Sequence, residues 1–190
     1  MNSRSKTRRH LTWLTTAAVI AALYVALTFL SMALGLDLTF LSMALGLDKN
    51  AVQIRFSEAL IVLAFITPAA VPGLTVGCLL ANLLTGCAPL DIIIGPVATL
   101  IGALGAYLIS KMKNGNLSRF ICTIPNIIAN TVIVTFICII CYTAPEARET
   151  SLIPFYASTV FLGEVISSGI LGTVLLFAAE KTVKRALNNM

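Results

Sequence analysis

The sequence has little charge. Only 11% of its 190 residues are Asp, Glu, Lys or Arg, against about 25% in an ordinary soluble domain. Apolar residues make up 58% of the chain, and the mean hydropathy is +0.95. So few charges cannot cover the surface of a small soluble domain. The chain is therefore predicted to be an integral membrane protein, with room for five or six spans of about 20 residues each.

Several kinds of site are also missing. The one histidine, His10, lies in a basic tail, so a multi-histidine metal site is excluded. No glycine-rich phosphate-binding motif of an ATP or dinucleotide site occurs. Cys138 and Cys141 have CxxC spacing, but within an apolar helix they are interpreted as small packing residues. No nucleophile–base pair lies within a span, and the basic residues form no single patch. We therefore do not expect the chain to be an enzyme, to bind a cofactor or a metal, or to have a nucleic-acid partner.

Six apolar segments predict an all-α integral membrane protein with six transmembrane helices. They follow a basic tail at about 1–10 and cover residues 11–30, 56–71, 72–86, 90–110, 119–143 and 155–179. Pro68, Pro72 and Gly73 predict a tight reversal between the second segment and the third.

The charges orient these segments. All but three of the 13 Lys and Arg residues flank the segments on one side, the exceptions being Lys49, Arg55 and Arg148. Because positive loops stay in the cytoplasm, both termini are predicted to be cytoplasmic. A cleaved signal peptide is the alternative for the N-terminus. The first apolar run is longer than a signal-peptide core, however, and no convincing cleavage site precedes Asp37.

An exact duplication follows the first segment. Residues 27–37, LTFLSMALGLD, recur identically at 38–48. A helical copy would present nearly the same face about 16 Å further along the axis. It could extend the first helix or form an amphipathic outer loop, and a recent tandem duplication without a function of its own is the favoured interpretation.

Glu164 is the clearest candidate for a functional site. It lies about ten residues into the sixth segment, or about 15 Å deep, and Ser168 shares its helix face. A charge at that depth costs at least about 2.5–3.5 kcal/mol. A structural carboxyl is the alternative, but basic residues that could pair with it occur only near the ends of the spans.

Amide side chains mark a second group of candidates. Asn126 and Asn130 are four residues apart in the fifth segment, so both point to one side of that helix. Their donors and acceptors suit the edge of a heterocycle, and Asn82 in the third segment is included by the same reasoning. Hydrogen bonding between helices is the common alternative.

The predicted outer mouth is rich in acids. Gln53, Arg55 and Glu58 precede or begin the second segment, and Asp91 begins the fourth. Arg55 and Glu58 are three residues apart, so they could simply pair at the rim. The acidic outer half nevertheless favours a cationic or amine-bearing ligand.

The first segment contains overlapping pairs of small residues, which allow another helix to approach closely. They include Ala17, Ala18, Ala21 and Ala22. The partner could be internal or another subunit, and the sequence leaves that choice open.

Five ordered strings resemble one bacterial family. They are QIRFSEAL at 53–60, FITPAAVPGLTVGCLLANLLTG at 65–86, LDIIIGPVATLIGAL at 90–104, PNIIAN at 125–130 and GEVISSGILG at 163–172. Together they resemble the queuosine-precursor transporter (QueT) family, the substrate-binding S components of energy-coupling factor (ECF) transporters. The resemblance covers about residues 15–180 and departs from the family's pattern at the 27–48 duplication.

The resemblance implies more than the residues show alone. It implies a compact six-helix bundle in the bacterial cell membrane, working with a membrane coupling subunit and two cytoplasmic ATPase subunits. Ala17, Ala18, Ala21 and Ala22 match the alanine-rich motif that contacts the coupling subunit. The implied substrate is a 7-deazaguanine such as 7-aminomethyl-7-deazaguanine. A stand-alone proton-coupled transporter or channel for another small cation, with Glu164 as its proton-linked site, is the alternative.

That ligand suits the candidate residues. A carboxylate accepts the paired donors of a guanine edge, and we expect Glu164 or Glu58 to do so. Asn130 is expected to face the carbonyl side, and Asp91 or Glu58 the amine.

Overall fold

The computed structural model describes residues 3–35, 54–112, 115–142 and 152–189. Every regular element in these ranges is a helix, and they contain no strand. The long helices are α1 (Ser3–Ala33), α4 (Ala70–Thr85), α5 (Pro89–Ile109), α7 (Ile124–Tyr142), α8 (Leu152–Glu164) and α9 (Gly172–Asn189). The short ones are the 3-10 helix η1 (Phe56–Val62), α3 (Leu63–Ile66), α6 (Gly115–Ile121) and the π-helix η3 (Val165–Leu171), which joins α8 to α9.

The six predicted segments recur as four long apolar helices and two shorter ones. Within the described residues, those long enough to cross a membrane are Lys6–Ala33, Pro89–Ile109, Asn116–Ile137 and Ile153–Ala186. The shorter apolar helices are Phe56–Ile66 and Ala70–Thr85. Large apolar side chains such as Leu14, Leu84 and Ile93 point outward from these helices. That pattern fits a molecule whose outer surface faces lipid.

Proline and glycine set the breaks between these helices. The reversal predicted from Pro68, Pro72 and Gly73 lies at the first of these three residues, since α3 ends at Ile66 and α4 begins at Ala70. Pro68 lies in the turn, and Pro72 lies in the first turn of α4, where a backbone N–H has no intrahelical partner. Gly86 ends α4 in the left-handed conformation, with a φ of +73°.

The second segment is the centre of the bundle. Residues 57–62 of η1 are all buried, and η1 packs against α1, α5, η3 and α9. Irregular backbone at membrane depth is tolerated where protein encloses it. The shortness of η1 and α3 is therefore compatible with a membrane protein, because other helices surround them.

Contacts between small residues establish how the helices run. A Cβ added at Gly73 would lie 2.7 Å from the Ala17 carbonyl oxygen, and one added at Gly77 would lie 2.7 Å from the Tyr24 Cβ. The later residue of α4 thus faces the later residue of α1, so the two helices run in the same direction.

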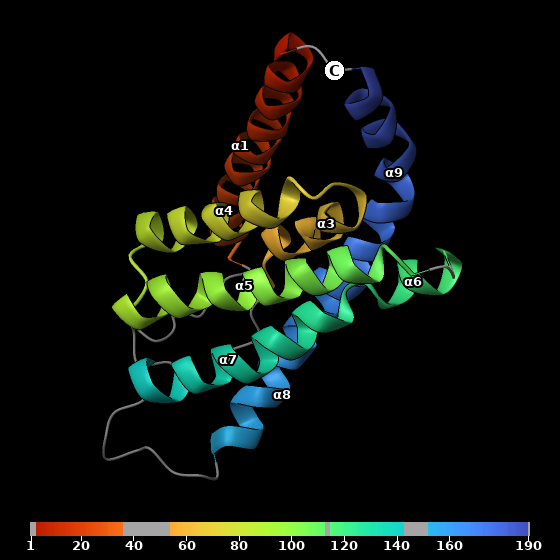
Figure 1. Cartoon of the computed structure of the whole chain (residues 1–190). Coiled ribbons are helices and arrows are strands. Elements are labelled where there is room, and N and C mark those ends of the chain that lie inside the picture. Colours follow the sequence, from red (N-terminus) through yellow and green to blue (C-terminus); the bar gives the residue numbers. More distant parts are fainter. Residues whose placement is uncertain (1–2, 36–53, 113–114, 143–151, 190) are drawn as a thin grey trace.

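Other contacts complete this pattern of directions. Tyr24 contacts Glu58 while the later Ser31 contacts the earlier Phe56, so α1 and η1 are antiparallel. The directions of α1, η1 and α4 match the alternation expected of the first three segments. The start of α1 and the end of α9 lie at the same end of the molecule (Figure 1).

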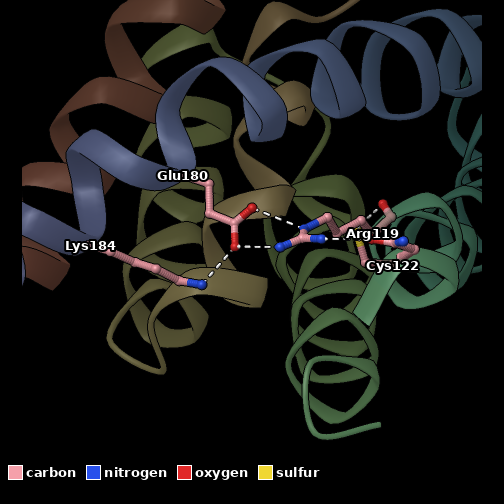
Figure 2. Close-up of polar contacts among 5 residues, drawn as sticks. Arg119, Cys122, Glu180 and Lys184 are labelled. Atoms are coloured by element: carbon pink, nitrogen blue, oxygen red, sulfur yellow. Dashed lines mark hydrogen bonds and ion pairs between the residues drawn. The ribbon is translucent and has the colours of Figure 1, made fainter. Parts of the chain in front are cut away.

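Charged side chains meet where α6 approaches α9. The Arg119 Nε donates to Glu180 Oε2 at 3.0 Å, and the Lys184 Nζ donates to Glu180 Oε1 at 2.6 Å (Figure 2). Arg119 also donates to Asn116 at 3.1 Å. Arg119 and Lys184, two of the basic residues predicted to be cytoplasmic, are thereby brought together although they lie far apart in the sequence.

The duplication falls only partly within the described residues. Its first copy continues α1 as far as Ala33, and a turn follows to Gly35. The second copy, 38–48, lies outside the described residues. The predicted basic tail is helical from Ser3 onward and belongs to α1.

Candidate functional site

Asn126 of α7 lies between two carboxylates from different elements. Its Nδ2 lies 3.1 Å from Glu58 Oε2 of η1, 3.1 Å from Glu164 Oε2 of α8 and 3.2 Å from Ser168 Oγ of η3. An amide nitrogen carries two hydrogens, so three acceptors share two donors. The cluster is rich in acceptors and would be completed by a ligand that donates hydrogen bonds.

The orientation of the Asn126 amide follows from its neighbours. Reversing it would turn its oxygen toward both carboxylates, which repel it. Its Oδ1 faces Gly102 of α5 and is buried without a hydrogen-bond partner among the described residues. The absence of a side chain at Gly102 allows α7 to approach α5 this closely.

Glu58 is held from both sides. Its Oε1 accepts a hydrogen bond from the Tyr24 hydroxyl of α1, and its Oε2 accepts the one from Asn126. Glu58 is 4% exposed and Tyr24 is 1% exposed. The carboxylate is therefore fixed in place before any ligand binds.

Two serines anchor the backbone that carries Glu58. The Phe56 N–H donates to Ser31 Oγ of α1 at 2.8 Å, and the Arg55 N–H donates to Ser167 Oγ of η3 at 3.1 Å. N–H groups at the start of a helix lack partners within it, so these serines satisfy donors that would otherwise be unpaired. They tie η1 to α1 on one side and to η3 on the other.

A small cavity adjoins this cluster. It measures about 20 Å³, room for about one water molecule. Its lining residues are Arg55, Glu58, Asn130, Val134, Val160 and Glu164. Asn130 Nδ2 is a buried donor without a hydrogen-bond partner in the described structure. The cavity thus combines two carboxylates, one guanidinium and one available amide donor.

The π-helix η3 begins directly after Glu164. Its successive serines serve different elements, since Ser167 contacts the start of η1 and Ser168 contacts Asn126. Short π-helical segments within α-helices occur frequently at functional sites. Here the segment lies where α8 and α9 meet the cluster.

The structure brings together most of the predicted site residues but not all of them. Glu58, Asn126, Glu164 and Ser168 form the hydrogen-bonded cluster, and Arg55 and Asn130 line the cavity beside it. Gln53 lies outside the described residues.

Asp91 and Asn82 do not line this cavity. They meet at the α4–α5 turn, where Asn82 Nδ2 donates to the Asp91 carbonyl oxygen at 3.1 Å. Asp91 lies in the first turn of α5, where a negative charge is stabilised by the helix dipole. The geometry of both residues matches the interhelical bonding that was the alternative for Asn82.

Tyr24, Ser31 and Ser167 were not predicted. A signal for two of them is present in α1, since Tyr24, Thr28 and Ser31 recur at helical spacing and are all buried. These hydroxyls continue the buried face that begins with Ala17 and Ala21. Hydroxyl groups confined to one face of an apolar helix indicate a polar neighbour on that side.

The four alanines divide between two faces of α1. Ala17 and Ala21 are buried against Gly73 and Gly77 of α4. Ala18 and Ala22 are exposed. The partner of Ala17 and Ala21 is therefore internal, namely α4. Of the four alanines, Ala18 and Ala22 are the two that remain accessible to another subunit.

No group of three or more His, Cys, Asp or Glu residues that could hold a metal ion occurs in the described part of the chain. A family model described as QueT transporter matches residues 14–181. No curated protein and no solved structure matches the chain.

Proposed function

Since the chain belongs to the QueT transporter family, we propose that it is the substrate-binding subunit of an ECF-type uptake transporter and captures a cationic 7-deazaguanine from outside the cell. The ligand proposed is 7-aminomethyl-7-deazaguanine or a close queuosine precursor. The single observation that carries the proposal is the acceptor-rich cluster around Asn126, which joins Glu58 and Glu164.

The chemistry of that ligand complements the cluster. A guanine edge presents a ring N–H and an amine, which a carboxylate accepts as a pair. Glu164 suits this task because only its Oε2 has a hydrogen-bond partner among the described residues. Asn130 Nδ2, a buried donor beside the cavity, suits the guanine carbonyl oxygen.

Glu58 suits the ligand's aminomethyl cation. Its position is already fixed by Tyr24 and Asn126, and a carboxylate oxygen can accept more than one hydrogen bond. Two carboxylates beside one guanidinium give the cavity a formal charge of −1 when both are ionised. A monocation would balance that charge.

Binding is expected to widen the site. The cavity of about 20 Å³ is far smaller than the roughly 300 Å³ or more of ordinary ligand pockets. Glu58 and Glu164 come from η1 and α8, and the Asn126 amide donates to both of them. A ligand that replaces this amide as the shared donor could therefore separate the two carboxylates.

The energy for uptake is proposed to come from partner subunits. The chain has no phosphate-binding loop, so a membrane coupling subunit and two cytoplasmic ATPases would supply ATP hydrolysis. The exposed alanines of α1, Ala18 and Ala22, are the proposed contact with the coupling subunit.

Calorimetry with the purified chain tests this function. We expect 7-aminomethyl-7-deazaguanine to bind tightly, and guanine and riboflavin to bind weakly or not at all. A folded chain that binds none of the three would overturn the proposed substrate class.

The neighbouring carboxylates also favour one competing function, a proton-coupled secondary transporter. Uptake assays in cells lacking the ATPase subunits separate the two mechanisms. Under our proposal, uptake stops without the ATPases. Uptake that persists without them and collapses when an uncoupler dissipates the proton gradient would support the competing function.

A further inference from the structure

We propose that Tyr24 determines the preference of the site for a cationic ligand, acting as a positioning residue through Glu58. This inference rests on the proposed function, because it concerns how that site distinguishes a charged deazaguanine from an uncharged one. Tyr24 lies on α1, outside the residues that line the cavity, so its effect is exerted through the carboxylate that it holds.

The Tyr24 hydroxyl is rigidly placed. The side chain is 1% exposed, and its Cβ lies against Gly77 of α4, where an added Cβ would come within 2.7 Å. A tyrosine ring has only two rotatable side-chain bonds, so packing at its base fixes its hydroxyl group. That hydroxyl has one hydrogen and donates it to Glu58 Oε1.

Glu58 depends on such support. A glutamate has three side-chain torsions, and this one must keep its charge at a defined point beside the cavity. Tyr24 holds Oε1 and Asn126 holds Oε2. The Asn126 amide also donates to Glu164 and Ser168. The Tyr24 hydroxyl, by contrast, donates to Glu58 and not to Glu164.

The two ends of the ligand should therefore respond differently to the loss of this hydroxyl. The guanine edge is assigned to Glu164 and Asn130, neither of which has a hydrogen bond to Tyr24. The aminomethyl cation is assigned to Glu58. Removing the hydroxyl should weaken the hold on the cation and leave recognition of the guanine edge nearly unchanged.

The test compares two ligands, 7-aminomethyl-7-deazaguanine and its uncharged parent 7-deazaguanine, by calorimetry on the full chain. We expect Tyr24→Phe to weaken binding of the aminomethyl compound about ten-fold, the scale of one lost hydrogen bond to a charged group. Binding of 7-deazaguanine should change by less than about two-fold, because the residues assigned to the guanine edge, Glu164 and Asn130, have no hydrogen bond to Tyr24. Tyr107→Phe is the matched control, since Tyr107 lies beneath Lys111 and away from the cavity, and it should change neither affinity.

A double-mutant cycle shows whether Tyr24 acts through Glu58. Glu58→Gln should remove the preference for the charged ligand, and Tyr24→Phe should then add less than about two-fold, because its target is already gone. Equal weakening of both ligands by Tyr24→Phe, or an undiminished effect in the Glu58→Gln background, would overturn the inference.

Two further outcomes separate this inference from the function beneath it. If the wild-type chain binds neither compound, the proposed function fails and the role of Tyr24 fails with it. If the wild-type chain binds and Tyr24→Phe does not fold, Gly77→Ala replaces it, because the added Cβ would lie 2.7 Å from the Tyr24 Cβ and would displace the ring. An undiminished preference for the charged ligand in a folded Gly77→Ala chain overturns the inference, and a reduced preference supports it.

Discussion

Asn126 allows two carboxylates to lie close together in the interior of a membrane protein. Glu58 and Glu164 repel each other when both are ionised, and a low-dielectric surrounding strengthens that repulsion. The shared amide donor, 3.1 Å from an oxygen of each, offsets part of this cost. An arrangement that remains short of donors binds a donor-rich cation more readily than an anion or an apolar molecule.

Glu164→Gln tests the assignment of the guanine edge. The substitution keeps an oxygen that can accept from Asn126, but it removes the charge and one of the two acceptors that a guanine edge requires. We expect binding of 7-aminomethyl-7-deazaguanine to weaken at least about ten-fold, while thermal unfolding in detergent stays near that of the wild type. Glu180→Gln, the same change in the Arg119 ion pair, is the control. Unchanged affinity in Glu164→Gln would remove Glu164 from the site.

The cost of burying charge made part of this site predictable. Glu164 and the amides Asn126 and Asn130 stand out because an apolar segment has few reasons to contain them. Tyr24 and Ser167 do not stand out in this way, since tyrosine and serine are common in membrane helices. Asn82 and Asp91 were predicted as ligand contacts from their residue types. In the structure they instead hydrogen-bond to each other and close the α4–α5 turn. Which polar residues meet depends on helix rotation, and no single segment encodes that.

Close approach of α5 and α7 places Asn126, and glycine makes that approach possible. A Cβ added at Gly102 would lie 2.8 Å from the Asn126 Cα, and one added at Gly105 would lie 2.7 Å from the Pro125 Cγ. The first of these neighbours is backbone and cannot turn away. The spacing of these two helices thus determines whether the Asn126 amide reaches both carboxylates.

Gly102→Ala tests that dependence. We expect it to destabilise the protein by about 1–3 kcal/mol, the usual cost of overpacking, and to weaken ligand binding because Asn126 is displaced. Gly169→Ala is the matched control, since the neighbour nearest to its added Cβ would be Ile127 Cδ1, at an ordinary contact distance of 3.6 Å. Thermal unfolding and calorimetry on both variants provide the comparison. Equal melting temperatures for Gly102→Ala and wild type would contradict the role given to this contact.

Hydropathy predicted the helices but not their irregular parts. Each of the six apolar segments contains a helix, and the breaker residues Pro68 and Gly86 lie in the breaks. The 3-10 form of η1 and the π form of η3 were not predicted. Their backbone hydrogen bonds adjust to contacts with other elements, such as Ser31 with Phe56 and Ser167 with Arg55, and composition carries no record of those partners.

The molecule as a whole connects its central site to α1. Tyr24 of α1 contacts Glu58, and one to two turns earlier the same helix packs on α4 through Ala17 and Ala21. Another face of α1 carries Ala18 and Ala22, which are exposed. One helix therefore contacts the site with its buried face and leaves Ala18 and Ala22 accessible on another. A shift of Glu58 on ligand binding would act directly on α1 through the hydrogen bond from Tyr24.

Two neighbouring alanines separate the internal contact from the external one. Ala18→Leu should leave folding and ligand affinity unchanged and should weaken co-purification with the coupling subunit, because a larger side chain prevents close helix approach. A loss of about ten-fold or more in the complex corresponds to the 1–3 kcal/mol typical of overpacking. Ala17→Leu should instead lower the melting temperature, since Ala17 packs on Gly73. Intact complex formation by a folded Ala18→Leu chain would place the coupling subunit on a different surface.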